Sequence, residues 1–261
     1  MNIVGVGFHL FLMLFALGVW KFSFFPSNFL HTNRRALLSW LALMFACECL
    51  IYLLLVKWSA PSVHEDAGEI TFYLVFSMIW IVLTQGLFAF LGVSVRDDVA
   101  ERRNLAAGFA AAGLTIAATG CAAGSNIGDG PGFEVMFFCA GISTASLLIL
   151  WAMVAQVSGI AEAITIDRNV GAGIRAAGWL AGTGMVLGTC VAGDWISYAA
   201  TLKDLLRFGW PVAVSAFLYM WMERALNLRS TGAKLSRTAS ILTSAVMFAT
   251  GAAYAHWVGR H

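Results

Sequence analysis

Apolar stretches of about 20 residues, the length that an α-helix needs to cross the hydrocarbon core of a bilayer, follow one another along almost the whole chain. Hydrophobic residues make up 60% of the 261 residues and charged residues only 11%. This balance excludes an ordinary soluble globular domain. The sequence therefore predicts an all-α integral membrane protein with about eight transmembrane helices. Their expected ranges are 3–25, 36–57, 70–94, 104–124, 133–157, 169–193, 208–226 and 239–258.

The basic residues between these stretches alternate between two unequal sets, eleven against four. Lys and Arg concentrate in the cytoplasmic loops of membrane proteins. The larger set is therefore expected to be cytoplasmic, which places both termini outside and requires an even number of spans. The larger set is Lys21, Arg34, Arg35, Arg96, Arg102, Arg103, Arg168, Arg224, Arg229, Lys234 and Arg237, and the smaller is Lys57, Lys203, Arg207 and Arg260.

The segment 103–113 returns 65 residues later as the segment 168–178, with Arg, Asn, Ala, Gly, Ala, Ala and Gly at matched positions. Asn104 and Asn169 lie where N-cap residues would bind free amide groups, and small residues recur four apart, as in closely packed membrane helices. Because both copies start on the same side, they predict a parallel two-helix repeat. The expected division is 1–97 as an amino-terminal three-helix segment, 98–230 as the duplicated region with repeats about 103–160 and 168–226, and 231–261 as the final transmembrane helix.

Two interpretations of the repeated segment stay open at this point. In the first, the two copies form a capped, tightly packed helix pair at the centre of a bundle. In the second, the paired helix N-termini, each with an Asn and an Arg, form a cytoplasmic entrance for an anion or a substrate. Both interpretations use the same atoms.

The pattern of a polar residue and Asn opening a helix, followed by Ala-Gly and Ala-Ala-Gly steps, covers 103–124 and 168–193. It resembles the repeated unit of the YjfL-like bacterial membrane family, a domain of unknown function. This resemblance implies a bacterial inner-membrane protein with duplicated helix pairs. It supplies no catalytic residues.

Polar residues inside the apolar stretches are costly in a membrane, and they are the main candidates for function. Glu48 lies near the middle of the second expected span, where it suits either a proton carrier or cation site, or a neutral carboxyl bonded to a neighbouring helix. Arg175 is expected to extend to the cytoplasmic headgroups, or to form a buried pair with Glu48 or another carboxylate. Gln85 is a candidate for hydrogen bonds between helices.

His9 and His256 suggest a cofactor, because each follows a small residue four positions earlier. A small residue there leaves room for a flat macrocycle against the helix, such as a haem or a chlorophyll-type pigment. The alternative is an interfacial His beside an aromatic residue with no cofactor. The five cysteines have no zinc-type spacing, so no metal site and no disulfide framework is expected.

These features favour a small channel or transporter of ions or small solutes, using Glu48, Arg175 and the interface between the repeats. The alternative is a structural or accessory subunit of a larger membrane complex, in contact with a haem or pigment. No catalytic constellation is found, which disfavours an enzyme. The expected partners are the lipid bilayer and either further copies of the chain or other membrane subunits, and the net charge of +2 gives no indication of nucleic acid.

Overall fold

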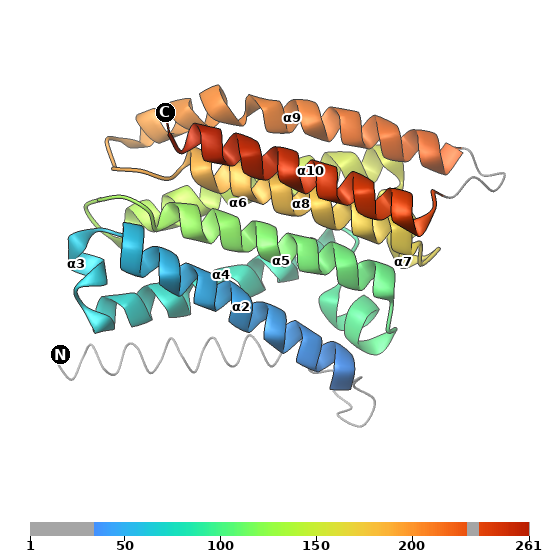
Figure 1. Ribbon diagram of the computed structural model, residues 1–261, viewed down its shortest axis with the longest axis horizontal. Helices are drawn as coiled ribbons and strands as arrows, with labels where there is room; N and C mark the ends of the chain where they lie inside the picture. The colour runs from blue at the N-terminus through green and yellow to red at the C-terminus, as the bar shows by residue number, and fades with distance from the viewer. Residues whose placement is uncertain (1–33, 229–234, 261) are drawn as a thin grey trace.

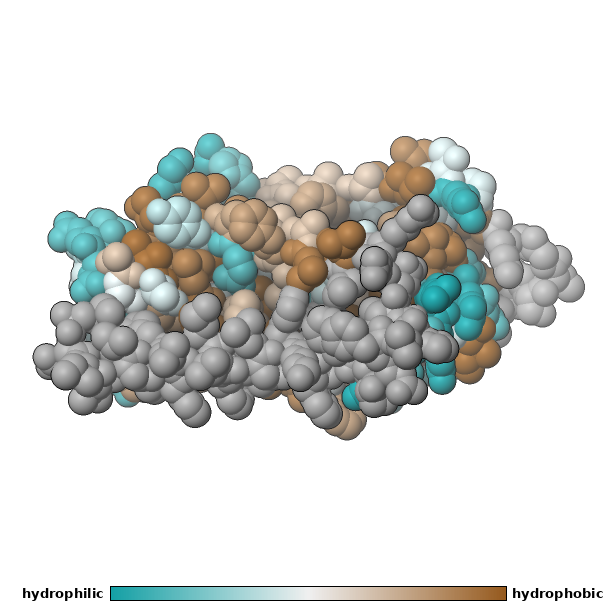
Figure 2. Space-filling model, turned by 90° about the horizontal axis from the view of Figure 1, so that it is seen from below, coloured by the Kyte–Doolittle hydropathy of each residue, from teal (hydrophilic) through white to brown (hydrophobic). Residues whose placement is uncertain are grey.

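The computed structural model describes residues 34–228 and 235–260, and this part of the chain is all-helical and contains no sheet. Six of the helices in these ranges are long and apolar enough to cross a membrane. In Figure 2, hydrophobic surface runs along the middle of the molecule, and hydrophilic residues gather mainly towards its two ends. The chain is therefore a polytopic membrane protein. The six helices are α2 (Arg34–Trp58), α4 (Ala67–Phe90), α5 (Leu105–Ser125), α6 (Phe133–Ser158), α9 (Tyr198–Leu228) and α10 (Arg237–Val258).

Two of the eight expected spans, 208–226 and 169–193, differ from what the structure shows. The first expected span, 3–25, lies outside the described residues. The range 208–226 is part of a longer helix, α9, which starts at Tyr198. The range 169–193 does form a long helix, α8 (Val170–Cys190), but it is not among the six that hydropathy selects. Most of α8 is buried. A helix that is shielded from lipid by its neighbours does not need an apolar outer face.

Figure 1 shows α2, α5, α8 and α10 running in one direction and α4, α6 and α9 running in the other. Along the first set, α5 packs on α8, and α8 packs on α10. Short helices join the long ones: α3 (Pro61–His64), the π-helix η2 (Val95–Glu101) and α7 (Ile160–Thr165). The N-termini of α5 and α8 thus lie at one end of the bundle, here called the cap end. Their C-termini lie at the other, here called the pocket end.

The helices α5 and α8 start in the same unusual way. Arg103 and Arg168 have φ values of 53° and 51°, and they are the only described residues other than glycine with a positive φ. This conformation is uncommon for a residue with a side chain. In each case the next residue is the N-cap, as the sequence predicts: the Oδ1 atoms of Asn104 and Asn169 accept hydrogen bonds from backbone amides one turn into the helix.

The ends of these two helices also match. Gly128 follows α5 and Gly193 follows α8, with φ values of 100° and 120°, and an Asp comes directly after each glycine. The two loops bind each other: the amide of Gly193 donates to the Ile127 carbonyl, and the amide of Asp129 donates to Asp194 Oδ1 at 2.9 Å. All these paired positions are 65 residues apart, the same spacing as in the sequence.

Glycines set the spacing between the parallel helices. A methyl group added to Gly113 or Gly124 of α5 would collide with backbone atoms of α8, and one added to Gly178 of α8 would collide with Ser244 of α10. Backbones that approach this closely pack by van der Waals contact over their whole length, which is how helices associate in lipid. The helices α5, α8 and α10 therefore form one tightly packed layer, here called the glycine layer.

Candidate functional site

Arg175 lies inside the bundle and does not reach the membrane surface. Its side chain is 3% exposed, and it pairs with the fully buried Glu223 of α9. Nε donates to Glu223 Oε1 at 2.6 Å, Nη2 donates to Glu223 Oε2 at 2.7 Å, and Nη1 donates to Ser240 Oγ of α10 at 2.9 Å. The expected contact with headgroups is therefore wrong, and the carboxylate partner of Arg175 is Glu223 and not Glu48.

This ion pair connects α8, α9 and α10. Each of the three guanidinium nitrogens donates a hydrogen bond, and both carboxylate oxygens accept one. Two buried charges are tolerated when they pair with this geometry, because the attraction and the hydrogen bonds offset the loss of water. The Arg175–Glu223 pair is therefore a structural connection in which each guanidinium nitrogen and each carboxylate oxygen has a partner within the protein.

Gln85 of α4 contacts α5 and α2. Its Nε2 atom donates to Thr115 Oγ1 at 2.9 Å and lies 3.7 Å from Met44 Sδ, while its buried Oε1 atom has no hydrogen-bond partner in the described structure. Glu48 is one helical turn after Met44, half-buried, and its Oε1 is also enclosed without a partner among the described residues. The structure thus brings two of the sequence-derived candidates to one interface, with acceptor atoms unsatisfied.

A second polar contact joins α4 and the end of α5. Asn126, the C-cap residue of α5, is 7% exposed, and its Nδ2 donates to Ser77 Oγ at 3.3 Å. Its Oδ1 accepts no hydrogen bond within the described ranges. Ser77 precedes Gln85 by eight positions, about 12 Å along the helix, and buried Ile81 lies between them. We call Gln85, Thr115, Ser77 and Asn126 the polar seam.

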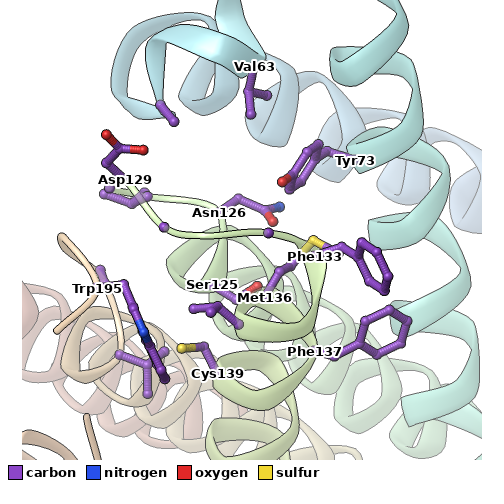
Figure 3. A pocket seen from close by; sticks show the side chains of 18 of the residues that line it. Val63, Tyr73, Ser125, Asn126, Asp129, Phe133, Met136, Phe137, Cys139 and Trp195 are labelled. Atoms are coloured by element: carbon purple, nitrogen blue, oxygen red, sulfur yellow. The ribbon is translucent and has the colours of Figure 1, made fainter. Parts of the chain in front are cut away.

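The polar seam reaches a pocket of about 1030 Å³ at the pocket end of the bundle. The pocket lies between the start of α4, the start of α6 and the two mutually bonded loops that follow α5 and α8. Figure 3 shows Asn126, Asp129, Tyr73 and Trp195 arranged around the same space. No Lys, Arg or His is among the described residues that line it. The acidic lining residues are Asp66, Glu69, Asp129, Asp194 and Asp204.

The other sequence-derived candidates lie elsewhere. Asn104 and Asn169 are at the cap end, and the Nδ2 atom of Asn104 donates to the Ile164 carbonyl at 2.8 Å, so both polar atoms of its amide are used by the fold. His256 is an exposed residue near the end of α10 and does not line the pocket. His9 lies outside the described residues.

Sequence reasoning missed the residues that form the pocket. Asp129 and Asp194 were detectable, because the Gly-Asp pairs that contain them are separated by the same 65 residues as the helix starts. Nothing in the local sequence marks Asn126, whose importance depends on Ser77 of another helix. In the part of the chain that the structure describes, no three His, Cys, Asp or Glu side chains form a group that could hold a metal ion.

Fold and site together define a polytopic helical membrane protein with an acidic pocket at one end of its bundle. No protein-family model matches the chain, and neither a curated protein nor a solved structure matches it.

Proposed function

We propose that this protein is a small channel or transporter, and that the pocket is where a solute first binds. The observation that carries the proposal is the position of Asn126. This residue forms part of the pocket wall and is also the outermost member of the polar seam. A polar group at membrane depth is retained where it serves a solute pathway. The pocket and the seam therefore form two parts of one route.

We further propose that the chain is built from repeated helix pairs of about 65 residues. The matched starts and ends of α5 and α8 support this. The spacing also extends beyond the two segments with similar sequences, since α4, α6 and α9 begin at residues 67, 133 and 198, and α5, α8 and α10 begin at residues 105, 170 and 237. If the range 3–25 precedes α2 as α4 precedes α5, the chain has eight spans in four helix pairs, and all four pairs have the same orientation.

The orientation follows from the charges at the two ends. Lys57, Lys203, Arg207 and Arg260 lie near the ends of helices at the pocket end, and the members of the larger basic set that the structure describes lie at the cap end. By the positive-inside rule, the cap end is cytoplasmic and the pocket opens to the extracytoplasmic side. The bacterial inner membrane stays a prediction.

A route through the seam needs a movement of helices. Ile81 and Val82 are completely or almost completely buried between the two polar contacts of the seam, so the route is closed in this structure. The glycine layer is held by close backbone packing of α5, α8 and α10, whereas α4 meets α5 through the Gln85–Thr115 hydrogen bond. We infer that α2 and α4 move against the glycine layer, and that Glu48 and Gln85 contact the solute when they separate.

Flux into proteoliposomes tests the proposal. With choline and potassium as separate probes, we expect uptake above that of empty liposomes, and we expect Glu48→Gln to reduce it by about tenfold or more because an intramembrane carboxylate is lost. Glu162→Gln, the same change at an exposed position of the cap end, is the control and should keep the wild-type rate. An absence of flux, together with companion chains in a native mass measurement, would instead support the accessory subunit.

A further inference from the structure

We propose that the pocket binds an organic cation with an ammonium group, of the size of choline. This inference rests on the proposed function and deepens it, because it names the class of solute. It follows from three independent properties of the pocket: its charge, the aromatic character of its walls, and the unsatisfied acceptor of Asn126.

The charge of the pocket favours a cation. Its lining contains five carboxylates and no basic side chain among the described residues. Two of the five already serve the fold, since Asp66 accepts from the Gly68 amide and Asp194 accepts from the Asp129 amide. The carboxylates of Glu69, Asp129 and Asp204 take no part in a hydrogen bond or ion pair within the described ranges. Such a concentration of one sign of charge in a concave site raises the local concentration of the opposite ion.

The walls favour an organic cation over a metal ion. Aromatic side chains from α4, from α6 and from the loop before α9 face the pocket, and Phe76 and Phe137 pack edge to face with their ring centres 4.7 Å apart. The faces of such rings attract ammonium groups, above all quaternary ones. Calcium and magnesium ions need six or more oxygen ligands close together, and no metal-binding group of three side chains occurs among the described residues. The aromatic lining includes Tyr73, Phe76, Trp80, Phe133, Phe137 and Trp195.

Asn126 offers a hydrogen-bond acceptor to the ligand, in addition to the carboxylates and aromatic rings that attract its positive charge. Its side chain is more than nine-tenths buried at the wall of the pocket, and its Oδ1 has no hydrogen-bond donor in the described structure. Buried acceptors of this kind are nearly always satisfied in native proteins. In Figure 3 the Asn126 amide lies between Asp129 and Tyr73. Oδ1 is enclosed in this structure, and Nδ2 is bonded to Ser77 Oγ. When the amide turns towards the pocket and exchanges its contact with Ser77 for one with the ligand, a hydroxyl or N–H group of the ligand satisfies Oδ1, while the ammonium lies against the carboxylates and rings.

Binding to the full chain in lipid nanodiscs tests this inference. The probes are choline and its neutral isostere 3,3-dimethylbutan-1-ol, measured by isothermal titration calorimetry. We expect saturable binding of choline and at least about tenfold weaker binding of the neutral alcohol. The double variant Asp129→Asn, Glu69→Gln should weaken choline binding by about tenfold or more, and both positions are exposed, so folding is not at risk. Asp167→Asn, an exposed carboxylate at the cap end, should bind choline like the wild type.

Equal affinity for the two probes, or choline binding that the double variant leaves unchanged, would overturn the inference. The binding and flux measurements also separate this inference from the proposed function. Choline binding without flux of any probe would contradict the transporter and leave the cation site standing. Flux of potassium without choline binding would support the channel and remove the organic-cation site.

Discussion

Two of the groups of buried polar side chains in the described part of this bundle differ in how completely their hydrogen bonds are satisfied. In the Arg175–Glu223 pair, every nitrogen of the guanidinium and both oxygens of the carboxylate are bonded. At the α2–α4–α5 interface, by contrast, Glu48, Gln85 and Asn126 each have a buried oxygen with no partner among the described residues. A satisfied buried group stabilises one arrangement of helices, whereas an unsatisfied one lowers stability and calls for another explanation. We assign a structural role to the first group and a role in solute transport to the second.

The largest effect on stability is expected from breaking the ion pair. Glu223→Gln leaves the buried Arg175 guanidinium without its counter-charge, which should reduce the free energy of unfolding by about 3–5 kcal/mol. The loss of stability is measured as a lower unfolding temperature in detergent, followed by circular dichroism. The double variant Arg175→Met, Glu223→Leu removes both charges and should recover most of the loss. If Glu223→Gln unfolds at the wild-type temperature, the pair does not have the structural role assigned to it.

A smaller loss of unfolding free energy is expected when a substitution disturbs the packing of the glycine layer. Gly124→Ala places a methyl group against the backbone of Gly188, and overpacking of this kind costs about 1–3 kcal/mol. The matched control is Gly141→Ala in α6, where no atom lies within 4 Å of the added methyl group. Because Ala is the better helix former, the control should be neutral or slightly stabilising. Equal unfolding temperatures for the two variants would contradict close contact between α5 and α8.

The two N-cap residues should differ in how much they contribute to stability, although they hold equivalent positions at the starts of α5 and α8. Asn104 accepts from two amides and also donates to the Ile164 carbonyl, whereas Asn169 accepts from the amide of Ala172. Asn104→Ala should therefore cost about 1–2 kcal/mol, and Asn169→Ala about 1 kcal/mol or less. Chemical denaturation of both variants in the same detergent measures the difference. A larger loss for Asn169→Ala would show that the two helix starts are supported in another way.

The local parts of this structure could be predicted from the sequence, and the distant contacts could not. The N-caps and small-residue packing of α5 and α8 follow from patterns within a few turns of helix, and the structure confirms them. The partner of Arg175 lies 48 positions away on another helix, and no periodicity reports such a pairing. The start of α9 was missed for a related reason, because Lys203, Asp204 and Arg207 lower the hydropathy of its first turns.

The site was predictable only in part. Glu48 and Gln85 could be found because polar residues stand out in apolar stretches. The pocket could not, since its acidic residues come from four separate loops and helix ends that look like ordinary solvent-exposed connections in the sequence. Their convergence depends on the bonds between the loops that follow α5 and α8.

Gln85→Leu tests most directly whether the unsatisfied groups serve function. Thr115 keeps its hydrogen bond to the Ala111 carbonyl in this variant, and the unsatisfied Oε1 atom is removed. The unfolding temperature and the choline flux into proteoliposomes are measured on the same preparation. We expect an unfolding temperature equal to or above that of the wild type, with flux reduced by about tenfold or more. A variant that unfolds at a clearly lower temperature, or that keeps the wild-type flux, would place Gln85 with the structural residues and contradict the assignment.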